Sequence, residues 1–185
     1  IFSKKDKQKK VNLKGLITEP VIVRASLPMP KVVGRAKRYE YYVAPVEIHI
    51  AEVEVDIETG EIKVVHFTAA HDVGKAINPT LALEQIRGGA FMGLSTALAE
   101  ELVIESGRVV NPDYKDYKIL SALDACVLEP LLIEKPSPEG PYGAKGIGEI
   151  PTVSIASAIG NAVCNATGVR FRDLPLTAEK VLSGL

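Results

Sequence analysis

The sequence predicts an α+β fold built from β-hairpins and packed helices. Period-two alternation of apolar residues over 39–56 and 61–69 predicts two strands joined as a hairpin. Apolar residues at helical spacing over 81–102, and a run rich in small residues over 151–167, predict two helices. With 185 residues, the chain is long enough for one substantial domain or two small lobes with a buried core.

The hairpin is the clearest local pattern. Val46, Ile48 and Ile50 share one face of its first strand. The alternation then slips by one residue at Ala51, which predicts a β-bulge or a bend. The polar residues 58–60 (Glu-Thr-Gly) form the expected turn into the second strand.

The first predicted helix has a clear start and an unusual interior. Asn78 is a suitable N-cap, and Pro79 suits the first helical turn. Each glycine inside a helix costs about 1 kcal/mol relative to alanine. Three of them within six positions therefore require the close approach of another backbone or of a ligand: Gly88, Gly89 and Gly93.

The remaining elements are shorter. Apolar pairs around a Glu-Ser-Gly turn predict a second hairpin over 103–110. The small-residue helix over 151–167 is expected to be buried and to end at Gly168. A terminal helix over 175–185 is expected to have Thr177 as its N-cap.

Composition excludes several functions. A net charge of −1, aromatic residues at 5% and the absence of tryptophan argue against a nucleic-acid-binding surface. No apolar run is long enough to span a membrane, and nothing resembles a secretion signal, so a cytoplasmic protein is expected. Cys126 and Cys164 lack the spacing of a zinc or iron–sulfur site and are expected to be free thiols.

The stretch GPYGAKGIGEIP, residues 140–151, carries the first candidate for chemistry. Its single carboxylate, Glu149, follows four glycines, which allow a bulky ligand to approach the backbone closely. Glu149 also lies just before the predicted helix start at Pro151. On the residues alone, the simpler interpretation is therefore that Glu149 caps a helix.

Other polar residues are weaker candidates. Gln85 carries a neutral amide suited to hydrogen-bonding an oxo group or a pterin edge, but on the residues alone a solvated helix face is the favoured interpretation. His49 and His66 lie on the two predicted strands of one hairpin and are possible neighbours, while His71 falls in a predicted loop. Their spacing does not indicate metal ligation, and no metal ligand is predicted.

Four separated segments resemble one known family. They are AEVEVDIETGEIKVVHFTAAHDVGKAINP, EQIRGGAFMGLSTALAEEL, GPYGAKGIGEIPTVSIASAIGNAV and LPLTAEKVL. In order and spacing they are similar to the C-terminal part of the molybdenum-binding subunit of the xanthine dehydrogenase and aldehyde oxidoreductase family. The resemblance assigns residues 39–185 to the C-terminal part of a molybdopterin-binding domain, and leaves 1–38 as a basic tail with a lead-in strand.

The resemblance implies an activity and roles for three residues. Members of the family hydroxylate an N-heterocycle or an aldehyde and take the oxygen from water. The glutamate of their GxGE motif acts as the general base, which is Glu149 here. Gln85 and Gly148 correspond to positions beside the cofactor. A base on a rigid turn against a large cofactor would explain why one acid is surrounded by glycines.

The resemblance also implies cofactors and partners. The cofactor would be molybdenum on molybdopterin, expected in its cytosine dinucleotide form, with [2Fe–2S] centres and FAD on partner chains. The remaining half of the molybdenum subunit, an iron–sulfur subunit and a flavin subunit would be the partners, and the substrate a small molecule. The chain alone is expected to be inactive and to expose an apolar patch where the missing half docks. The alternative is a non-catalytic or relic scaffold module on the same fold, in which Glu149 only caps a helix.

Overall fold

A computed structural model of the protein describes residues 45–138 and 140–185. The predicted lead-in strand and basic tail lie outside these residues, as does the proposed boundary at residue 38. The strands are β1 (Val46–Val55), β2 (Ile62–Asp72), β3 (Ile104–Glu105), β4 (Arg108–Val109) and β5 (Val127–Ile133). The α-helices are α2 (Pro79–Leu98), α3 (Ile155–Thr167) and α4 (Ala178–Gly184), and the 3₁₀ turns are η2 (Ala122–Asp124), η3 (Pro141–Gly143) and η4 (Ile150–Thr152).

The predicted hairpin is confirmed and forms most of a three-stranded sheet with the order β1-β2-β5. β1 and β2 are antiparallel, and β5 joins β2 in parallel. At the turn, the side chain of Asp56 accepts hydrogen bonds from the backbone N–H groups of Glu58 and Thr59. β2 continues to Asp72, three residues beyond its predicted end. His71 therefore lies in a strand, and its assignment to a loop is wrong.

The slip predicted at Ala51 has a different cause from the one expected. Side chains of β1 alternate between exposed and half-buried without interruption, so β1 contains no bulge at Ala51. The register shifts instead between Glu52 and Val53, where β2 contributes the additional residue, Val65. Both faces of β1 carry apolar residues, which is why the apolar pattern shifts along a regular strand. Ile48 is exposed on one face, whereas Val53 packs against the core on the other.

The helices begin and end with the expected signals, with two shifts of boundary. Asn78 caps α2 through its side chain, which accepts from the N–H of Leu81. Thr177 caps α4 in the same way, through the N–H of Lys180. α2 ends at Leu98, four residues before its predicted end. The helix predicted from Pro151 begins at Ile155, after η4, and ends as expected at left-handed Gly168.

Two of the three glycines in α2 are explained by helix packing. A Cβ on Gly89 would lie 2.8 Å from Cβ of Pro151 in η4, and one on Gly93 would overlap the side chain of Ile155 in α3. These contacts bring α2 against η4 and the start of α3. A Cβ on Gly88 would meet no described atom within 4 Å, so helix packing does not account for that glycine.

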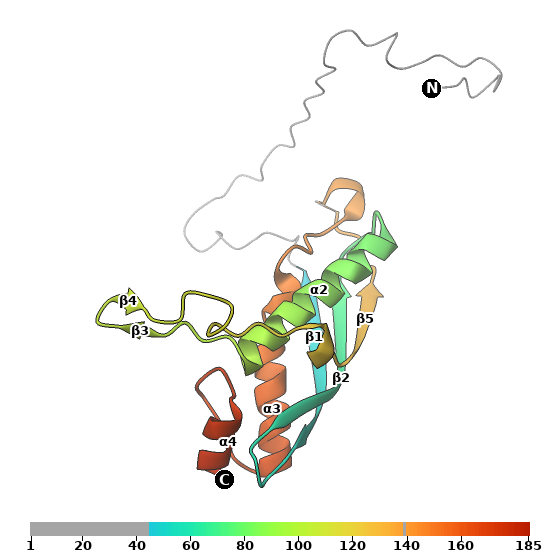
Figure 1. Ribbon diagram of the computed structural model, residues 1–185. Helices are drawn as coiled ribbons and strands as arrows, with labels where there is room; N and C mark the ends of the chain where they lie inside the picture. Colours follow the sequence, from blue (N-terminus) through green and yellow to red (C-terminus); the bar gives the residue numbers. More distant parts are fainter. Residues whose placement is uncertain (1–44, 139) are drawn as a thin grey trace, which may run out of the picture. The chain divides into compact units, whose positions relative to one another are not determined.

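One face of the sheet is covered by helices. Figure 1 shows α2 in front of the strands and α3 alongside β1. The buried core between these layers consists of Phe67, Ala69, Ile86, Ala90, Leu94, Ala97, Ile155, Ile159, Val163 and Leu176. This packing fixes α2 and the segment before α3, which are the two elements that carry Gln85 and Glu149.

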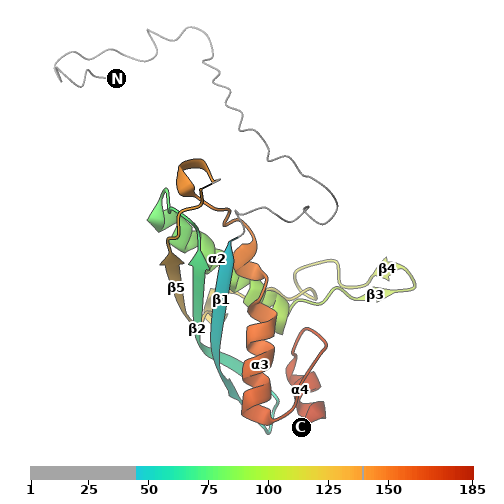
Figure 2. The same cartoon turned by 180° about the vertical axis from the view of Figure 1, so that it is seen from behind.

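The other face of the sheet, which we call the outer face, is turned toward the viewer in Figure 2 and carries exposed apolar side chains alongside polar ones. Strand register places one residue in two from each strand on it, because side chains alternate between faces. Its exposed apolar residues are Val46, Ile48, Ile50, Val127, Leu131 and Ile133, with exposures from 42% to 64%. The expected apolar patch is therefore present within the described residues.

The second hairpin is also confirmed, as β3 and β4, and it extends away from the sheet and helices (Figure 1). It exposes further apolar side chains, including Ile104 at 59% and Val109 at 43%. Among the described residues, no helix combines the length and hydropathy that crossing a membrane requires.

Candidate functional site

Glu149 occupies the N-cap position of η4, but its carboxylate makes no capping hydrogen bond. The main-chain carbonyl of Glu149 closes the turn instead, accepting from the backbone N–H of Thr152 at 3.0 Å and from its hydroxyl at 2.7 Å. Glu149 is exposed to solvent. Glu149 therefore holds the N-cap position that the capping interpretation expects, but its carboxylate takes no part in the cap.

Gln85 and the glycine loop are in direct contact. The side-chain Nε2 of Gln85 donates a 2.6 Å hydrogen bond to the carbonyl of Gly148, the residue before Glu149. Their separation of 63 residues in sequence is bridged by the packing of α2 against η4. The structure thus brings together all three predicted site residues, although sequence spacing alone does not pair Gln85 with Gly148 and Glu149.

A nearly buried ion pair holds the loop to the sheet. Nζ of Lys145 lies 2.7 Å from Oδ2 of Asp72, with side-chain exposures of 9% and 12%. Oδ1 of Asp72 also accepts from the N–H of Gly74, and the Lys145 N–H donates to the carbonyl of Val73 at 2.9 Å. Burial alone would raise the pKa of Asp72, but the hydrogen bonds from Lys145, Gly74 and Lys135 lower it below its ordinary value.

A cleft of about 450 Å³ lies between the start of α2 and the loop. Leu81 and Gln85 line it from the helix, and Lys145, Ile147 and Gly148 from the loop. An added Cβ on Gly146 or on Gly148 would meet no described atom within 4 Å, so the backbone is open to a ligand there.

The histidines are arranged differently from the prediction. His49 and His66 lie on opposite faces of the hairpin: His49 packs beside Phe67 on the helix side, and His66 faces Glu129 of β5. The neighbour of His49 is His71, with ring centroids 5.0 Å apart. The two histidines that could have been neighbours, His49 and His66, are therefore not in contact, because the extra residue in β2 changes which side chains share a face.

The two cysteines are free thiols, as expected. Burial raises the pKa of the Cys126 thiol, which disfavours the reactive thiolate at neutral pH. Neither cysteine adjoins the loop that carries Glu149, so they add nothing to the candidate site.

Comparison with known proteins decides the family. The model of a family described as "Molybdopterin cofactor-binding domain" matches residues 5–126, about two thirds of the chain. The chain belongs to the molybdopterin cofactor-binding domain family. Its α+β fold, with small sheets and packed helices, is the fold of that domain.

The relatives of this molybdopterin-binding domain are molybdenum-binding subunits. The chain is 40% identical over 132 residues to the putative xanthine dehydrogenase molybdenum-binding subunit XdhA of Escherichia coli (strain K12), a match covering 70% of this chain and 18% of that one. It is 37% identical over 149 residues to the aldehyde oxidoreductase molybdenum-binding subunit PaoC of the same organism, covering 79% and 20%. The chain therefore spans about a fifth of the length of these curated relatives.

A solved structure supports the same family relationship. Quinoline 2-oxidoreductase from Pseudomonas putida 86 superposes with a TM-score of 0.70 and 34% identity, covering 74% of this chain and 18% of that one. The chain is thus homologous to one part of the molybdenum-binding subunits of the xanthine dehydrogenase and aldehyde oxidoreductase family.

The described residues fit the cofactor after which the family is named. Gly88 lies one helical turn beyond Gln85. A Cβ added to Gly88 or to Gly148 would meet no described atom within 4 Å, so the backbone is open at both positions. The Gln85 amide donates through Nε2 to the loop, and its Oε1 has no hydrogen bond from any described residue. An acceptor amide beside open glycine backbone suits the N–H edge of a pterin.

Proposed function

We propose that this chain is a catalytic piece of a molybdenum hydroxylase subunit, in which Glu149 is the general base. The observation that carries the proposal is the exposed, uncapped carboxylate of Glu149 on a turn held by Gln85 through Gly148. The reaction class is the oxidative hydroxylation of an N-heterocycle or an aldehyde, with water as the source of oxygen.

Glu149 and Gln85 have separate tasks. The carboxylate of Glu149 accepts the proton released as water-derived oxygen is transferred to the substrate carbon, a contribution of about 10²–10⁴-fold. Gln85 positions Glu149 by fixing the carbonyl of Gly148, and presents Oε1 to an N–H donor of the pterin. The bound cofactor supplies the redox chemistry.

The rest of the site must come from outside the described residues. Glu149 is exposed, and a general base works best where bulk water is excluded. The outer face is likewise apolar without a described covering. We therefore propose that the remaining part of a molybdenum subunit covers the outer face and closes the site over Glu149. Without it, the chain is inactive.

The cofactors and partners follow from the same proposal. Molybdenum would be carried by molybdopterin in the cytosine dinucleotide form, in a cytoplasmic hetero-oligomer. Electrons would leave through [2Fe–2S] centres and FAD, which we propose lie on partner chains. The alternative, a scaffold module on the same fold, leaves the uncapped carboxylate of Glu149 without a task, and we therefore favour the catalytic role.

Ile48→Lys is expected to prevent assembly without unfolding the chain. Ile48 is 60% exposed on the outer face, so the isolated chain should keep its stability within about 0.5 kcal/mol. Docking would bury the new charge at a cost in binding free energy. We therefore expect the amount of the remaining molybdenum-subunit part that co-purifies with the chain to fall by at least about tenfold. Tagged chain expressed in its native host and quantified by mass spectrometry provides the measurement.

Ile57→Lys is the matched control. Ile57 is also an exposed isoleucine, at 70%, but lies in the turn after β1 rather than on the outer face. It should leave assembly unchanged. Equal assembly of the Ile48→Lys and Ile57→Lys variants would show that the outer face does not dock the rest of the subunit.

A further inference from the structure

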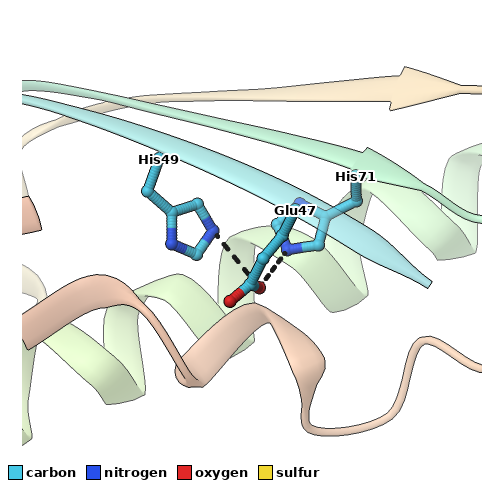
Figure 3. Close-up of side chains that lie close together, drawn as sticks. All are labelled: Glu47, His49 and His71. Carbon is cyan, nitrogen blue, oxygen red and sulfur yellow. Dashed lines mark hydrogen bonds and ion pairs between the residues drawn. The ribbon is translucent and has the colours of Figure 1, made fainter. Parts of the chain in front are cut away.

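Three titratable side chains converge at the end of the sheet nearest the start of α3. Glu47 and His49 come from β1 and His71 from β2, and Figure 3 shows the three side chains turned toward one another. Their side chains are 13%, 1% and 2% exposed, respectively. One potential ligand atom from each lies within 4.8 Å of the others. None of these side chains contributes to the site described above.

The distances are close to those of a tetrahedral metal site. Oε2 of Glu47 lies 3.2 Å from Nε2 of His71 and 3.7 Å from Nε2 of His49. Zinc bonds to histidine nitrogen and carboxylate oxygen at about 2.0–2.1 Å, which puts neighbouring tetrahedral ligand atoms about 3.3 Å apart. The two distances from Oε2 of Glu47 are within about 0.4 Å of that separation. The two histidine nitrogens lie within 4.8 Å of each other, so binding would draw the two rings closer together.

Hydrogen bonding within the protein leaves the cluster unsatisfied. Nε2 of His71 can donate a hydrogen bond to Oε2 of Glu47. Nε2 of His49 is too far from that oxygen for such a bond, and it is buried with no partner among the described residues. The cluster thus places an unpartnered imidazole nitrogen, on a ring that is 1% exposed, beside a carboxylate oxygen.

Supporting contacts orient two of the ligands. Nδ1 of His49 lies 2.8 Å from the hydroxyl of Ser154, and the backbone N–H of Ser154 donates to Oε1 of Glu47. Metal-binding histidines commonly use their second nitrogen in such a contact, which fixes the ring and leaves Nε2 for the metal. Nδ1 of His71 is buried and has no hydrogen-bond partner among the residues that the structure describes.

We propose that Glu47, His49 and His71 bind one divalent transition-metal ion of the zinc class, with a fourth position open to water. Two imidazoles with one carboxylate match the ligand set of zinc sites that keep such an open position, and imidazole disfavours magnesium and calcium. The ion joins β1 and β2 to the start of α3 through Ser154, five residues after Glu149. None of its three ligands is among the residues assigned to the molybdenum cofactor, and the proposal does not depend on the proposed hydroxylase function.

The test is direct titration of the full chain with zinc. Metal is first removed by dialysis against a chelator, and Zn²⁺ is then titrated in competition with a chromophoric chelator. We expect one tight site per chain, no competition from Mg²⁺, and X-ray absorption showing two imidazole ligands with bonds of about 2.0–2.1 Å. Absence of a tight site in the folded wild-type chain, judged by circular dichroism, would overturn the proposal.

Variants show whether the tight site is this cluster. Glu47→Gln and His49→Gln should each weaken zinc binding by at least about 100-fold, the upper range seen when only a supporting contact of a metal ligand is lost. His66→Gln is the matched control, because His66 lies on the opposite face and pairs with Glu129. A tight site that survives both cluster variants, or one that is lost in His66→Gln, would assign the binding elsewhere.

Discussion

Glu149→Gln is expected to lower turnover of the assembled hydroxylase by about 10²–10⁴-fold without releasing molybdenum. Glutamine keeps the size and polarity of the side chain but cannot accept a proton at neutral pH. Retention of molybdenum is expected because the carboxylate makes no capping bond, while the loop is held by Gln85 at Gly148 and by Lys145 at Asp72. Turnover per molybdenum, measured on the complex purified from its host, separates loss of the base from loss of the cofactor.

Glu58→Gln provides the control for this measurement. Glu58 is an exposed carboxylate in the turn between β1 and β2, outside the candidate site, and its substitution should leave turnover unchanged. If Glu149→Gln kept wild-type turnover per molybdenum, Glu149 would not be the base. If it lost molybdenum together with activity, Glu149 would have a role in holding the cofactor rather than in proton transfer.

Asp72→Asn is expected to destabilise the isolated chain by about 3–5 kcal/mol, the cost of leaving a buried charge without its partner. Asparagine retains an acceptor for the N–H of Gly74, so the substitution removes mainly the charge opposite Lys145, which is 9% exposed. Urea denaturation gives the free energy of unfolding. Glu54→Gln, which breaks an exposed 3.9 Å pair with Lys63, should change it by no more than about 0.5 kcal/mol.

The same ion pair predicts a pH dependence. The pKa of Asp72 is lower in the folded chain than its ordinary value near 4, so the folded state favours the carboxylate. Its contribution to stability is fully present above that ordinary value and is lost as the pH falls through the folded-state pKa. Asp72→Asn should flatten the acid limb of the stability profile. An unchanged acid limb, or a cost near that of Glu54→Gln, would contradict the assigned role of the pair.

Local patterns allowed the sequence to predict most of the fold. Asn78 and Thr177 cap helices through side-chain contacts with residues three positions later, so their signals depend on no distant part of the chain. The glycine cluster in α2 correctly indicated a close approach, and Gly89 and Gly93 pack against η4 and α3. The partner in that approach could not be read from the sequence, because it lies about 60 residues away.

The errors arose where tertiary context decides which face of a strand is buried. β1 carries apolar residues on both faces, so its pattern suggested a bulge at Ala51 where the strand is regular. The extra residue, Val65, lies in β2 and reverses the expected neighbours of His49. A search for histidines and carboxylates two residues apart on a strand would have paired Glu47 with His49. The addition of His71 required knowing that β2 extends to Asp72.

The candidate site was found through resemblance more than through physical pattern. On the residues alone, Glu149 before Pro151 favoured a helix cap, because acids near helix starts are common. The geometry differs because η4 is a short 3₁₀ turn closed by the main-chain carbonyl of Glu149, which leaves the carboxylate out of the cap. Gln85 has a clear structural reason only once its contact with Gly148 is known.

Molybdenum analysis of the native complex tests the central claim most directly. The polypeptide containing this sequence is isolated from its source by antibody, without a tag, and its molybdenum and iron are measured by mass spectrometry together with its mass and its co-purifying chains. The account predicts about one molybdenum per copy, in company with iron and with the rest of a molybdenum subunit, on the same or on another polypeptide. A metal-free chain of this length, isolated without partners, would contradict it.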